Sequence, residues 1–301
     1  MTKKEFRILL TEKCNANCPN CFNKDYRLAK DMTYENAKFI AKFLSNGGVE
    51  KLKIMGGEPT THEEFPELFE MLQYYFKTLI LFTNAKNDLI YKINPRDEDS
   101  IIYNFNFINK DFNDKKLLLS KKGIRNFEVQ VTNDMDLNIY KEKLRLIKQG
   151  LSNSKKLNLY LTLDCTSNIF LNRNKIIENW NDLTQFIENE LKSDFYIDHI
   201  IPLCFYKNSN MNIKQIPYIC NYMCAGLIDT NLDLRYCNQY PKILTHIDEN
   251  ISFKEVIELL KNGYEDKMKF QRESKCSVCK NFEISCNGGC FTNSKILQKK
   301  R

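Results

Sequence analysis

The sequence lacks long apolar runs, repeats, low-complexity tracts and a strong charge of one sign. Its longest apolar runs, such as residues 78–82, span about five residues, whereas a membrane-spanning helix needs roughly 20. The N-terminus has two lysines but no apolar segment of a signal peptide. The net charge of +7 is a mild excess and poor evidence for nucleic-acid binding. With 43% apolar and 28% charged residues, we expect a globular cytoplasmic protein without a membrane or nucleic-acid partner.

Cysteine, by contrast, is abundant and unevenly placed. Of twelve cysteines in 301 residues, three lie within residues 14–21 and seven within residues 220–290, and only Cys165 and Cys204 stand between. A disulfide framework is typical of small secreted domains, and this chain is neither small nor visibly secreted. The clustering therefore indicates metal-binding cysteines in a reducing compartment.

Short apolar runs alternate with helical patterns over the first two thirds of the chain. Strands are expected at residues 6–11, 51–55, 78–83, 100–108, 127–132, 157–163 and 197–204, and helices at 32–44, 65–76, 139–151 and 176–191. This alternation favours an α/β fold with a parallel sheet, in an open or partial barrel. Residues 85–126 fit the alternation least, which leaves an insertion open. The pattern fades after residue 206, with one helix expected at 253–261, so we predict two domains, residues 1–205 and 206–301.

Three cysteines follow the first expected strand with the spacing C-x3-C-x2-C, at Cys14, Cys18 and Cys21. Three thiolates can hold three corners of an iron–sulfur cube and leave the fourth iron without a protein ligand. Structural zinc takes four ligands, and four-cysteine clusters have every iron ligated. The triplet therefore favours an iron centre that is open to a substrate. From the spacing alone, buried cysteines or part of a zinc site remain alternatives.

Two short polar motifs follow the next two expected strands. Gly56, Gly57 and Glu58 follow the second strand, and Thr83 and Asn84 end the third. Paired glycines let a backbone approach a ligand closely, and a glutamate can accept a hydrogen bond from an ammonium group. Short polar side chains can meet ribose hydroxyls. Each motif alone is compatible with an ordinary turn, but barrels carry their sites at successive strand ends, so together they indicate a ligand site.

In this order, the three motifs make the chain resemble the radical SAM superfamily. The resemblance covers residues 6–84 well, and the rhythm of strands extends it to about residue 204. It implies a partial (β/α)6 barrel in which the three cysteines hold a 4Fe-4S cluster whose open iron chelates S-adenosylmethionine. It also implies an enzyme that generates a 5′-deoxyadenosyl radical, which abstracts a hydrogen atom from the substrate. By the same resemblance, the residues that bind S-adenosylmethionine are Gly56, Gly57, Glu58, Thr83 and Asn84.

Two departures from the family pattern are visible. Asn20 stands where many members carry an aromatic residue, just before the third cysteine. The usual Ser-x-Asp after the fourth strand is not evident either. Packing of the adenine against this loop is therefore left open.

The C-terminal cysteines form a second group: Cys220, Cys224, Cys237, Cys276, Cys279, Cys286 and Cys290. Without the N-terminal triplet, zinc ribbons would be the simpler interpretation. Beside a radical SAM core, the group resembles the SPASM or twitch extension, a small cysteine-rich domain with one or two auxiliary iron–sulfur clusters. That likeness implies a first cluster on Cys220, Cys224, Cys237 and Cys290, and a second on Cys276, Cys279 and Cys286.

This second resemblance is also incomplete. Leu232 occupies the position where the family usually has glycine, and no cysteine follows Cys290. The second auxiliary cluster therefore has three evident ligands, and the alternatives are an open iron, a ligand other than cysteine, or a single auxiliary cluster.

Cys165 and Cys204 end two expected strands, where a barrel places its site. Each is either a small buried hydrophobe, as many cysteines are, or a thiol that donates a hydrogen atom to a substrate radical. Both are candidate catalytic residues, and Cys204 is favoured because Pro202 ends the regular strand. Three further side chains are isolated and interpreted as surface or hydrogen-bonded residues rather than ligands: His62, His199 and His246.

The leading hypothesis is a radical SAM enzyme that modifies a ribosomally made peptide, by epimerisation or cross-linking. The family resemblance alone supplies this substrate class, together with an electron donor such as flavodoxin or ferredoxin. Because the first expected strand begins at residue 6, no peptide-recognition domain is expected before it. The alternatives are dehydrogenation or rearrangement of a small metabolite and, in another class, a zinc-binding module without catalysis.

Overall fold

The computed structural model describes residues 5–18, 21, 30–104, 124–150, 157–163, 172–197, 226–236, 242–268, 276 and 278–280. These residues divide into two compact units. The first contains the described residues up to Tyr103, residues 124–125 at the start of a strand that continues into the second unit, and the described residues within 226–267. Most of the second lies within residues 126–197. Residue 206, where the sequence predicts a domain boundary, lies outside the described residues, so that division stays a prediction.

The first unit is built on a sheet whose central strands are parallel. These strands are β1 (Glu5–Thr11), β2 (Lys51–Gly56), β3 (Thr78–Thr83) and β4 (Ser100–Asn104), and each pairs with the next. Three short strands continue the sheet beyond β1: β8 (Leu227–Ile228), β9 (Asp233–Arg235) and β10 (Ile243–His246). The order in this unit is β10-β9-β8-β1-β2-β3-β4, in which β8 is parallel to β1 and β9 and β10 are antiparallel additions.

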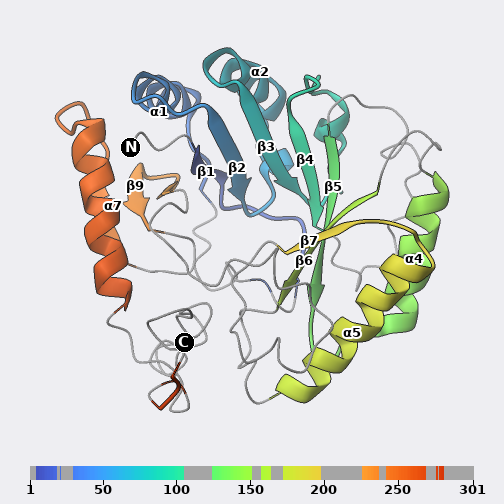
Figure 1. Ribbon diagram of the computed structural model, residues 1–301. Coiled ribbons are helices and arrows are strands. Elements are labelled where there is room, and N and C mark those ends of the chain that lie inside the picture. The colour runs from blue at the N-terminus through green and yellow to red at the C-terminus, as the bar shows by residue number, and fades with distance from the viewer. Residues whose placement is uncertain are drawn as a thin grey trace. The chain divides into compact units, whose positions relative to one another are not determined.

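Two helices lie side by side along the sheet of β1, β2 and β3 (Figure 1). They are α1 (Tyr34–Asn46) and α2 (Phe65–Tyr75), and they confirm the helices expected at 32–44 and 65–76. Thr33 caps the N-terminus of α1, and its side chain accepts a hydrogen bond from the backbone N of Asn36. Its buried residues have the spacing of one helical face: Ala37, Ile40, Ala41 and Leu44.

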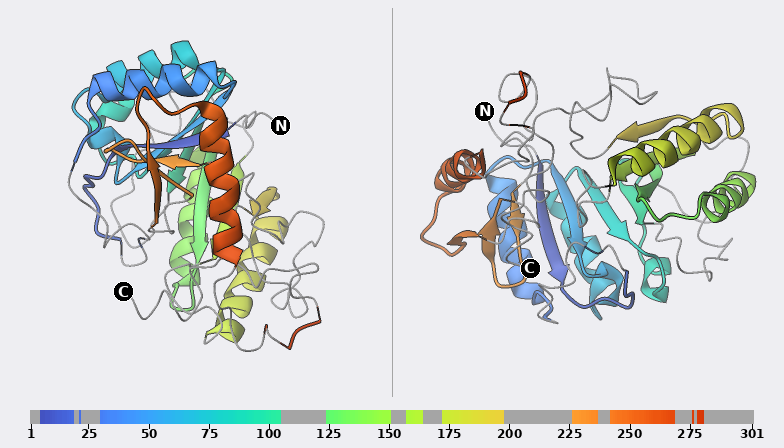
Figure 2. Two further views of the ribbon diagram at one scale, coloured as in Figure 1. Left: turned by 90° about the vertical axis from the view of Figure 1, so that its left-hand side faces the viewer. Right: turned by 90° about the horizontal axis from the view of Figure 1, so that it is seen from below.

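Helix α7 (Phe253–Met268) lies on the side of this sheet where β9 continues it beyond β1 (Figure 1 and Figure 2). The Phe253 ring lies 5.8 Å from the ring of Phe6 in β1 and 6.0 Å from that of Phe43 in α1. The sequence predicts this helix, although it runs further than residue 261. Strands β8, β9 and β10 were not predicted, because two to four residues are too few to show an alternation.

The connection from β3 to β4 contains a short 3-10 helix, η3 (Asp88–Tyr91), and ends at a buried carboxylate. Asp99 is fully buried and accepts hydrogen bonds from the backbone N of Leu79, the side chain of Gln73 and the guanidinium and backbone N of Arg96. Residues 85–126 fit the strand–helix alternation least, and hydrogen bonds to Asp99 hold part of this segment in place.

The second unit has the parallel strands β5 (Ile124–Val131), β6 (Asn158–Leu163) and β7 (Phe195–Ile197) and the helices α4 (Leu137–Gly150) and α5 (Arg173–Asn189). These elements confirm the strands expected at 127–132 and 157–163 and both helices. The strand expected at 197–204 differs, because β7 ends at Ile197 and residues 198–204 lie outside the described residues.

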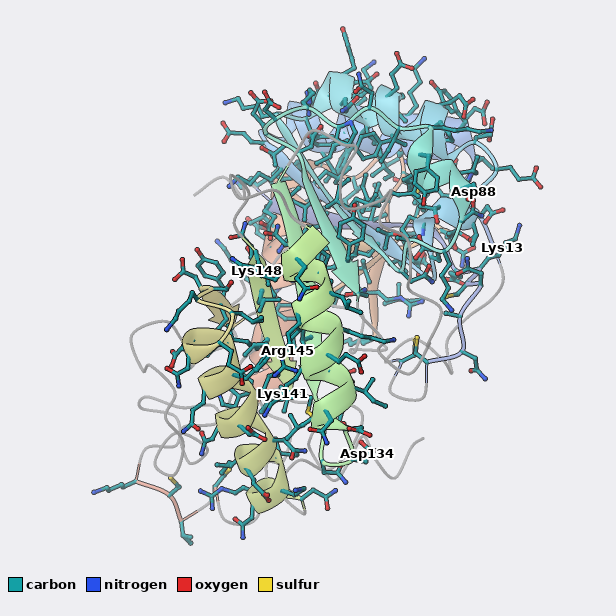
Figure 3. All side chains as sticks on the ribbon, turned by 90° about the vertical axis from the view of Figure 1, so that its right-hand side faces the viewer. Lys13, Asp88, Asp134, Lys141, Arg145 and Lys148 are labelled. Atoms are coloured by element: carbon teal, nitrogen blue, oxygen red, sulfur yellow. The ribbon has the colours of Figure 1, made fainter. Side chains whose placement is uncertain are left out.

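Charged side chains join α4 to α5, and Figure 3 shows three of the basic ones along α4. Lys141 forms an ion pair with Asp182 at 2.6 Å, and Arg145 forms one with Glu190 at 2.7 Å. Both cations also lie over the ring of Phe186. Among the described helices, none is long and apolar enough to cross a bilayer.

Candidate functional site

The first unit brings together the carboxyl ends of β1, β2 and β3, where the three sequence motifs lie. β1 leads into the cysteine loop, β2 ends at Gly56, and β3 ends at Thr83. Because neighbouring strands are parallel, these ends share one edge of the sheet. The predicted convergence of the motifs is therefore present in the fold.

The two glycines allow the end of β2 to touch the backbone that enters the cysteine loop. The backbone N of Gly57 donates to the carbonyl of Thr11 at 2.8 Å, and that of Glu58 donates to the carbonyl of Lys13 at 2.8 Å. A Cβ on Gly57 would lie 2.0 Å from the Lys13 oxygen. Gly56 has φ +152°, which side-chain-bearing residues rarely adopt, and a Cβ there would lie 2.1 Å from the Thr11 oxygen. Both glycines are thus required by a close approach of two protein segments, and their predicted contact with a ligand stays a prediction.

Glu58 links β2 to β3 through its carboxylate, and only 1% of its surface is exposed. Oε1 accepts hydrogen bonds from the hydroxyl of Thr60 at 2.6 Å, the backbone N of Thr60 at 3.2 Å and the hydroxyl of Thr83 at 2.6 Å. Among the described donors, Oε2 accepts from the backbone N of Asn84, at 2.6 Å. One oxygen is therefore saturated by the protein, whereas the other keeps capacity for a further donor.

Burial raises the pKa of the Glu58 carboxyl above its ordinary value, because desolvation disfavours the charged form. The hydrogen bonds from Asn84, Thr60 and Thr83 act in the opposite direction but do not cancel this effect. A buried carboxyl with a perturbed pKa at the end of a parallel strand is typical of a functional site.

Asn84 connects this network to the cysteine loop. Its side-chain amide donates to Oδ1 of Asn15 at 2.8 Å, and Asn15 lies between Cys14 and Cys18 in the sequence. The next residue, Ala85, has φ +57° and donates its backbone N to the Thr83 hydroxyl at 2.9 Å. Asn84 therefore holds Asn15 of the cysteine loop, and its predicted place near a ribose is untested.

The three cysteines of the triplet lie on a partly exposed loop after β1. The backbone N of Cys21 donates to the carbonyl of Cys18 at 3.3 Å, so the C-x2-C pair forms a turn. Within the described ranges, no three histidine, cysteine or acidic side chains converge as a metal site. The donor set nevertheless fits an iron–sulfur cluster, since three accessible thiols lie within eight residues and thiolates are the usual ligands of such clusters.

The remaining predicted site residues are only partly placed. Cys276 is partly exposed and Cys279 is exposed, and the backbone N of Cys279 donates to the carbonyl of Cys276 at 3.1 Å. His62 is buried with Nε2 2.9 Å from the carbonyl of Met32, whereas His246 lies 3.1 Å from Asp233 at the surface. The predicted residues outside the described ranges are Cys165, His199, Cys204, Cys220, Cys224, Cys237, Cys286 and Cys290.

A cluster of polar side chains lies at the base of the cysteine loop and is not evident from the sequence. Thr11 and Lys13 both contact the carboxylate of Asp31, on the far side of the loop. The sequence gives no local signal of this contact, because Asp31 is 20 residues from Thr11 and 18 from Lys13 and is not part of a helix or strand with a periodic pattern.

Comparison with known proteins finds sequence similarity in the part of the chain that contains the three motifs. Residues 8–99 match the sequence model of the Radical SAM superfamily. A probable GTP 3′,8-cyclase of Thermococcus kodakarensis is 36% identical over 81 residues, which cover 26% of this chain and 26% of that protein. The GTP 3′,8-cyclase of Haemophilus ducreyi is 34% identical over 70 residues, 22% of this chain and 21% of that protein. The chain thus spans about a quarter of the length of these curated relatives.

Two solved structures are similar over nearly the whole chain. SuiB of Streptococcus suis bound to precursor peptide SuiA has a TM-score of 0.69 at 16% identity, covering 96% of this chain and 72% of SuiB. Native anSMEcpe with bound AdoMet and Cp18Cys peptide has a TM-score of 0.63 at 20% identity, covering 95% of this chain and 88% of that one. At these identities the likeness concerns the fold, and it confirms the predicted α/β partial barrel.

Proposed function

Residues 8–99 match the Radical SAM superfamily, and from this premise we propose that the chain is a radical SAM enzyme, which cleaves S-adenosylmethionine reductively to start radical chemistry on a substrate. The observation that carries the proposal is the hydrogen-bonded edge of the sheet, where Glu58 and Asn84 join the ends of β2 and β3 to the cysteine loop. Cys14, Cys18 and Cys21 would hold a 4Fe-4S cluster, which when bound supplies the electron for this cleavage.

In this proposal Glu58 also orients the cofactor. Its Oε2 has capacity for a second donor, which suits the ammonium group of the methionyl part of S-adenosylmethionine. Thr83 and Asn84 would lie near the ribose, and Gly56 and Gly57 would form the backbone wall beside it. A hydrogen bond to a charged group contributes roughly 1.5–3 kcal/mol, so loss of the Glu58 carboxylate weakens binding by about ten- to a hundredfold.

Replacement of all three triplet cysteines by alanine tests the assignment of the cluster. The variant should contain about four fewer irons per chain than the wild type and form no 5′-deoxyadenosine from S-adenosylmethionine and dithionite. Continued formation of 5′-deoxyadenosine at the wild-type rate would contradict the proposal. The exposed variant Asp182→Ala, which breaks an ion pair between α4 and α5, is the control for handling and reconstitution.

The C-terminal cysteines are proposed to bind auxiliary clusters in a SPASM- or twitch-like domain over residues 206–301. Cys220, Cys224, Cys237 and Cys290 would form a fully ligated cluster, and Cys276, Cys279 and Cys286 a second one. The turn at Cys276 and Cys279 supports metal binding by this pair. Iron analysis distinguishes the alternatives, since about eight irons per chain correspond to one auxiliary cluster and about twelve to two. About four irons with stoichiometric zinc would instead support zinc ribbons.

For the substrate, we propose a ribosomally made peptide. SuiB and anSMEcpe, which are similar to this chain over 95% or more of its length, have structures with bound peptides. A short peptide encoded beside the gene is the substrate to test. Product mass analysis with a flavodoxin or ferredoxin as electron donor, under anaerobic and cytoplasm-like conditions, should show a modified peptide.

A small metabolite is the second candidate, because the curated relatives of part of the chain are GTP 3′,8-cyclases. Incubation with GTP instead of the peptide separates the two. Consumption of GTP with formation of 5′-deoxyadenosine, and no change in the peptide, would favour the second candidate.

Cys165 and Cys204 are proposed as hydrogen-atom donors if the reaction is redox-neutral. Replacement of the donor by serine should stop product formation while 5′-deoxyadenosine still forms. Turnover of the wild type in deuterium oxide should place deuterium in the product. Full activity of both single serine variants would show that neither thiol is the donor.

A further inference from the structure

The two ends of the cysteine loop are held together at its base. The backbone N of Met32 donates to the carbonyl of Leu10, and that of Glu12 donates to the carbonyl of Lys30, both at 2.8 Å. Between these bonds, Thr11 and Asp31 form an antiparallel bridge. Residues 10–12 and 30–32 thus close the base of the loop that carries the cysteine triplet.

Asp31 adds two side-chain contacts to this closure, both to residues that enter the loop. Oδ1 accepts a hydrogen bond from the Thr11 hydroxyl at 2.6 Å, and Oδ2 forms an ion pair with the Lys13 ammonium. The Thr11 hydroxyl in turn accepts a hydrogen bond from the backbone N of Lys13 at 3.0 Å. Asp31 therefore fixes both the backbone and the side chain of Lys13, the residue directly before Cys14. Lys13 is labelled at the start of this loop in Figure 3.

The opposite side of the same residues faces the turn after β2. The carbonyls of Thr11 and Lys13 accept hydrogen bonds from the backbone N atoms of Gly57 and Glu58. The entry to the loop is consequently held between the Gly57–Glu58 turn and Asp31. A shift of Lys13 on the Asp31 side changes the position of Cys14 relative to Glu58.

We propose that Asp31 is a positioning residue that sets the place of the cysteine loop, and hence of Cys14, against the Gly57–Glu58 turn. This rests on the proposed function, in which the loop holds the cluster and the turn binds the cofactor. Asp31 would act through its contacts with Thr11 and Lys13, and not by binding the cluster or the substrate itself. Its function would be to keep the cluster at the correct position relative to the bound S-adenosylmethionine.

The main variants are Asp31→Ala, which removes both contacts, and Asp31→Asn, which keeps an acceptor for Thr11 but loses the ion pair. Asp182→Ala is the matched control, because it breaks another partly exposed Lys–Asp pair. The first measurement is amide hydrogen exchange of the metal-free protein. In Asp31→Ala, the backbone amides of Glu12 and Met32 should exchange at least about tenfold faster than in the wild type. Their rates in Asp31→Asn should lie between those of Asp31→Ala and the wild type.

The second measurement uses the reconstituted, reduced protein. The electron paramagnetic resonance spectrum with S-adenosylmethionine should differ between Asp31→Ala and wild type, and the KM for S-adenosylmethionine should rise about tenfold. Lys13→Ala should cause part of the same change in the spectrum and in KM. The double variant Lys13→Ala/Asp31→Ala should change KM by less than the sum of the two single free-energy effects, because the residues act as one pair.

The outcomes separate this inference from the proposed function. A wild-type protein that assembles no N-terminal cluster overturns the proposed function, whereas the exchange rates still measure the closure of the loop. If the wild type cleaves S-adenosylmethionine and Asp31→Ala has the same amide exchange rates, electron paramagnetic resonance spectrum and KM, only the role of Asp31 is overturned. Additive effects of Lys13→Ala and Asp31→Ala would contradict action through the pair.

Discussion

Glu58→Ala should destabilise the protein strongly, even without any cofactor. The change removes an acceptor from four hydrogen bonds that end on the buried carboxylate. The two threonine hydroxyls can rotate toward other acceptors, but the backbone N–H groups of Thr60 and Asn84 cannot. A buried donor left without a partner costs about 1–3 kcal/mol. The Thr60 N–H is such a donor, and the part-buried Asn84 N–H loses less. With a partial loss at the hydroxyls, we expect a decrease of about 2–5 kcal/mol in the free energy of unfolding.

Glu58→Gln should cost less, about 1–3 kcal/mol. The amide oxygen can keep the three bonds now made by Oε1, but the amide nitrogen then faces the backbone N–H of Asn84 and cannot accept from it. Guanidinium unfolding of the metal-free protein measures both variants. Glu70→Ala, an exposed change on α2, is the control and should lie within about 0.5 kcal/mol of wild type. If Glu58→Ala unfolds at the wild-type midpoint, the hydrogen bonds to the Glu58 carboxylate are not what holds the ends of β2 and β3 together.

The pH dependence of the same variants provides a second check. Because burial raises the pKa of Glu58 in the folded state, the folded protein binds more protons than the unfolded chain between the two pKa values. The contribution of Glu58 to stability is therefore fully present below its ordinary pKa and is lost as the pH rises through the raised one. The stability advantage of wild type over Glu58→Gln should shrink over that range. An advantage that grows with pH would refute the assigned direction.

Three further changes have defined outcomes. Gly57→Ala should displace the entry of the cysteine loop, because its Cβ would lie 2.0 Å from the Lys13 oxygen, and cluster loading should fall by more than half at equal protein concentration. Asn84→Ala should leave the fold intact but release Asn15, which faster limited proteolysis within residues 14–29 would show. Asp99→Asn should lower stability at neutral pH by about 2–4 kcal/mol in urea unfolding. Burial alone would raise the pKa of Asp99, but the hydrogen bonds from Arg96, Leu79 and Gln73 outweigh it and hold the pKa below its ordinary value. The stability difference between wild type and Asp99→Asn should therefore shrink as the pH falls below about 4.

The position of the motifs at one sheet edge could be predicted because parallel strands place their carboxyl ends together. The partners of the motif residues could not. Glu58 was expected to face an ammonium group, yet its Oε1 is saturated by Thr60 and Thr83, which lie two and 25 residues away. Hydrogen bonds of this kind depend on side-chain direction at a strand end, and strand periodicity carries no information about it.

The segments that escaped prediction share a physical reason. β8 and β9 have two and three residues and take their stability from pairing with β1 and with each other. Leu232, in the turn between them, has φ +65°, a conformation that favours glycine. The Leu232 side chain is 8% exposed, so the burial of its apolar surface offsets the strain of the backbone. This is the position where the SPASM or twitch pattern usually has glycine.

The pairing of β1 with β8 also orders events during synthesis of the chain. Arg7 pairs with Leu227, so one edge of β1 lacks its partner until that later part of the chain has emerged from the ribosome. At about 5–20 residues per second, this interval lasts roughly 10–45 s. During it, β1 presents unpaired N–H and C=O groups of the kind that recruit other strands. The cysteine loop is synthesised early in the same interval, and Asn231, which accepts a hydrogen bond from Lys30 at the loop's base, comes late. Ribosome-bound chains from which residue 231 has emerged should therefore differ from shorter ones in the protease sensitivity of β1 and of the loop that follows it.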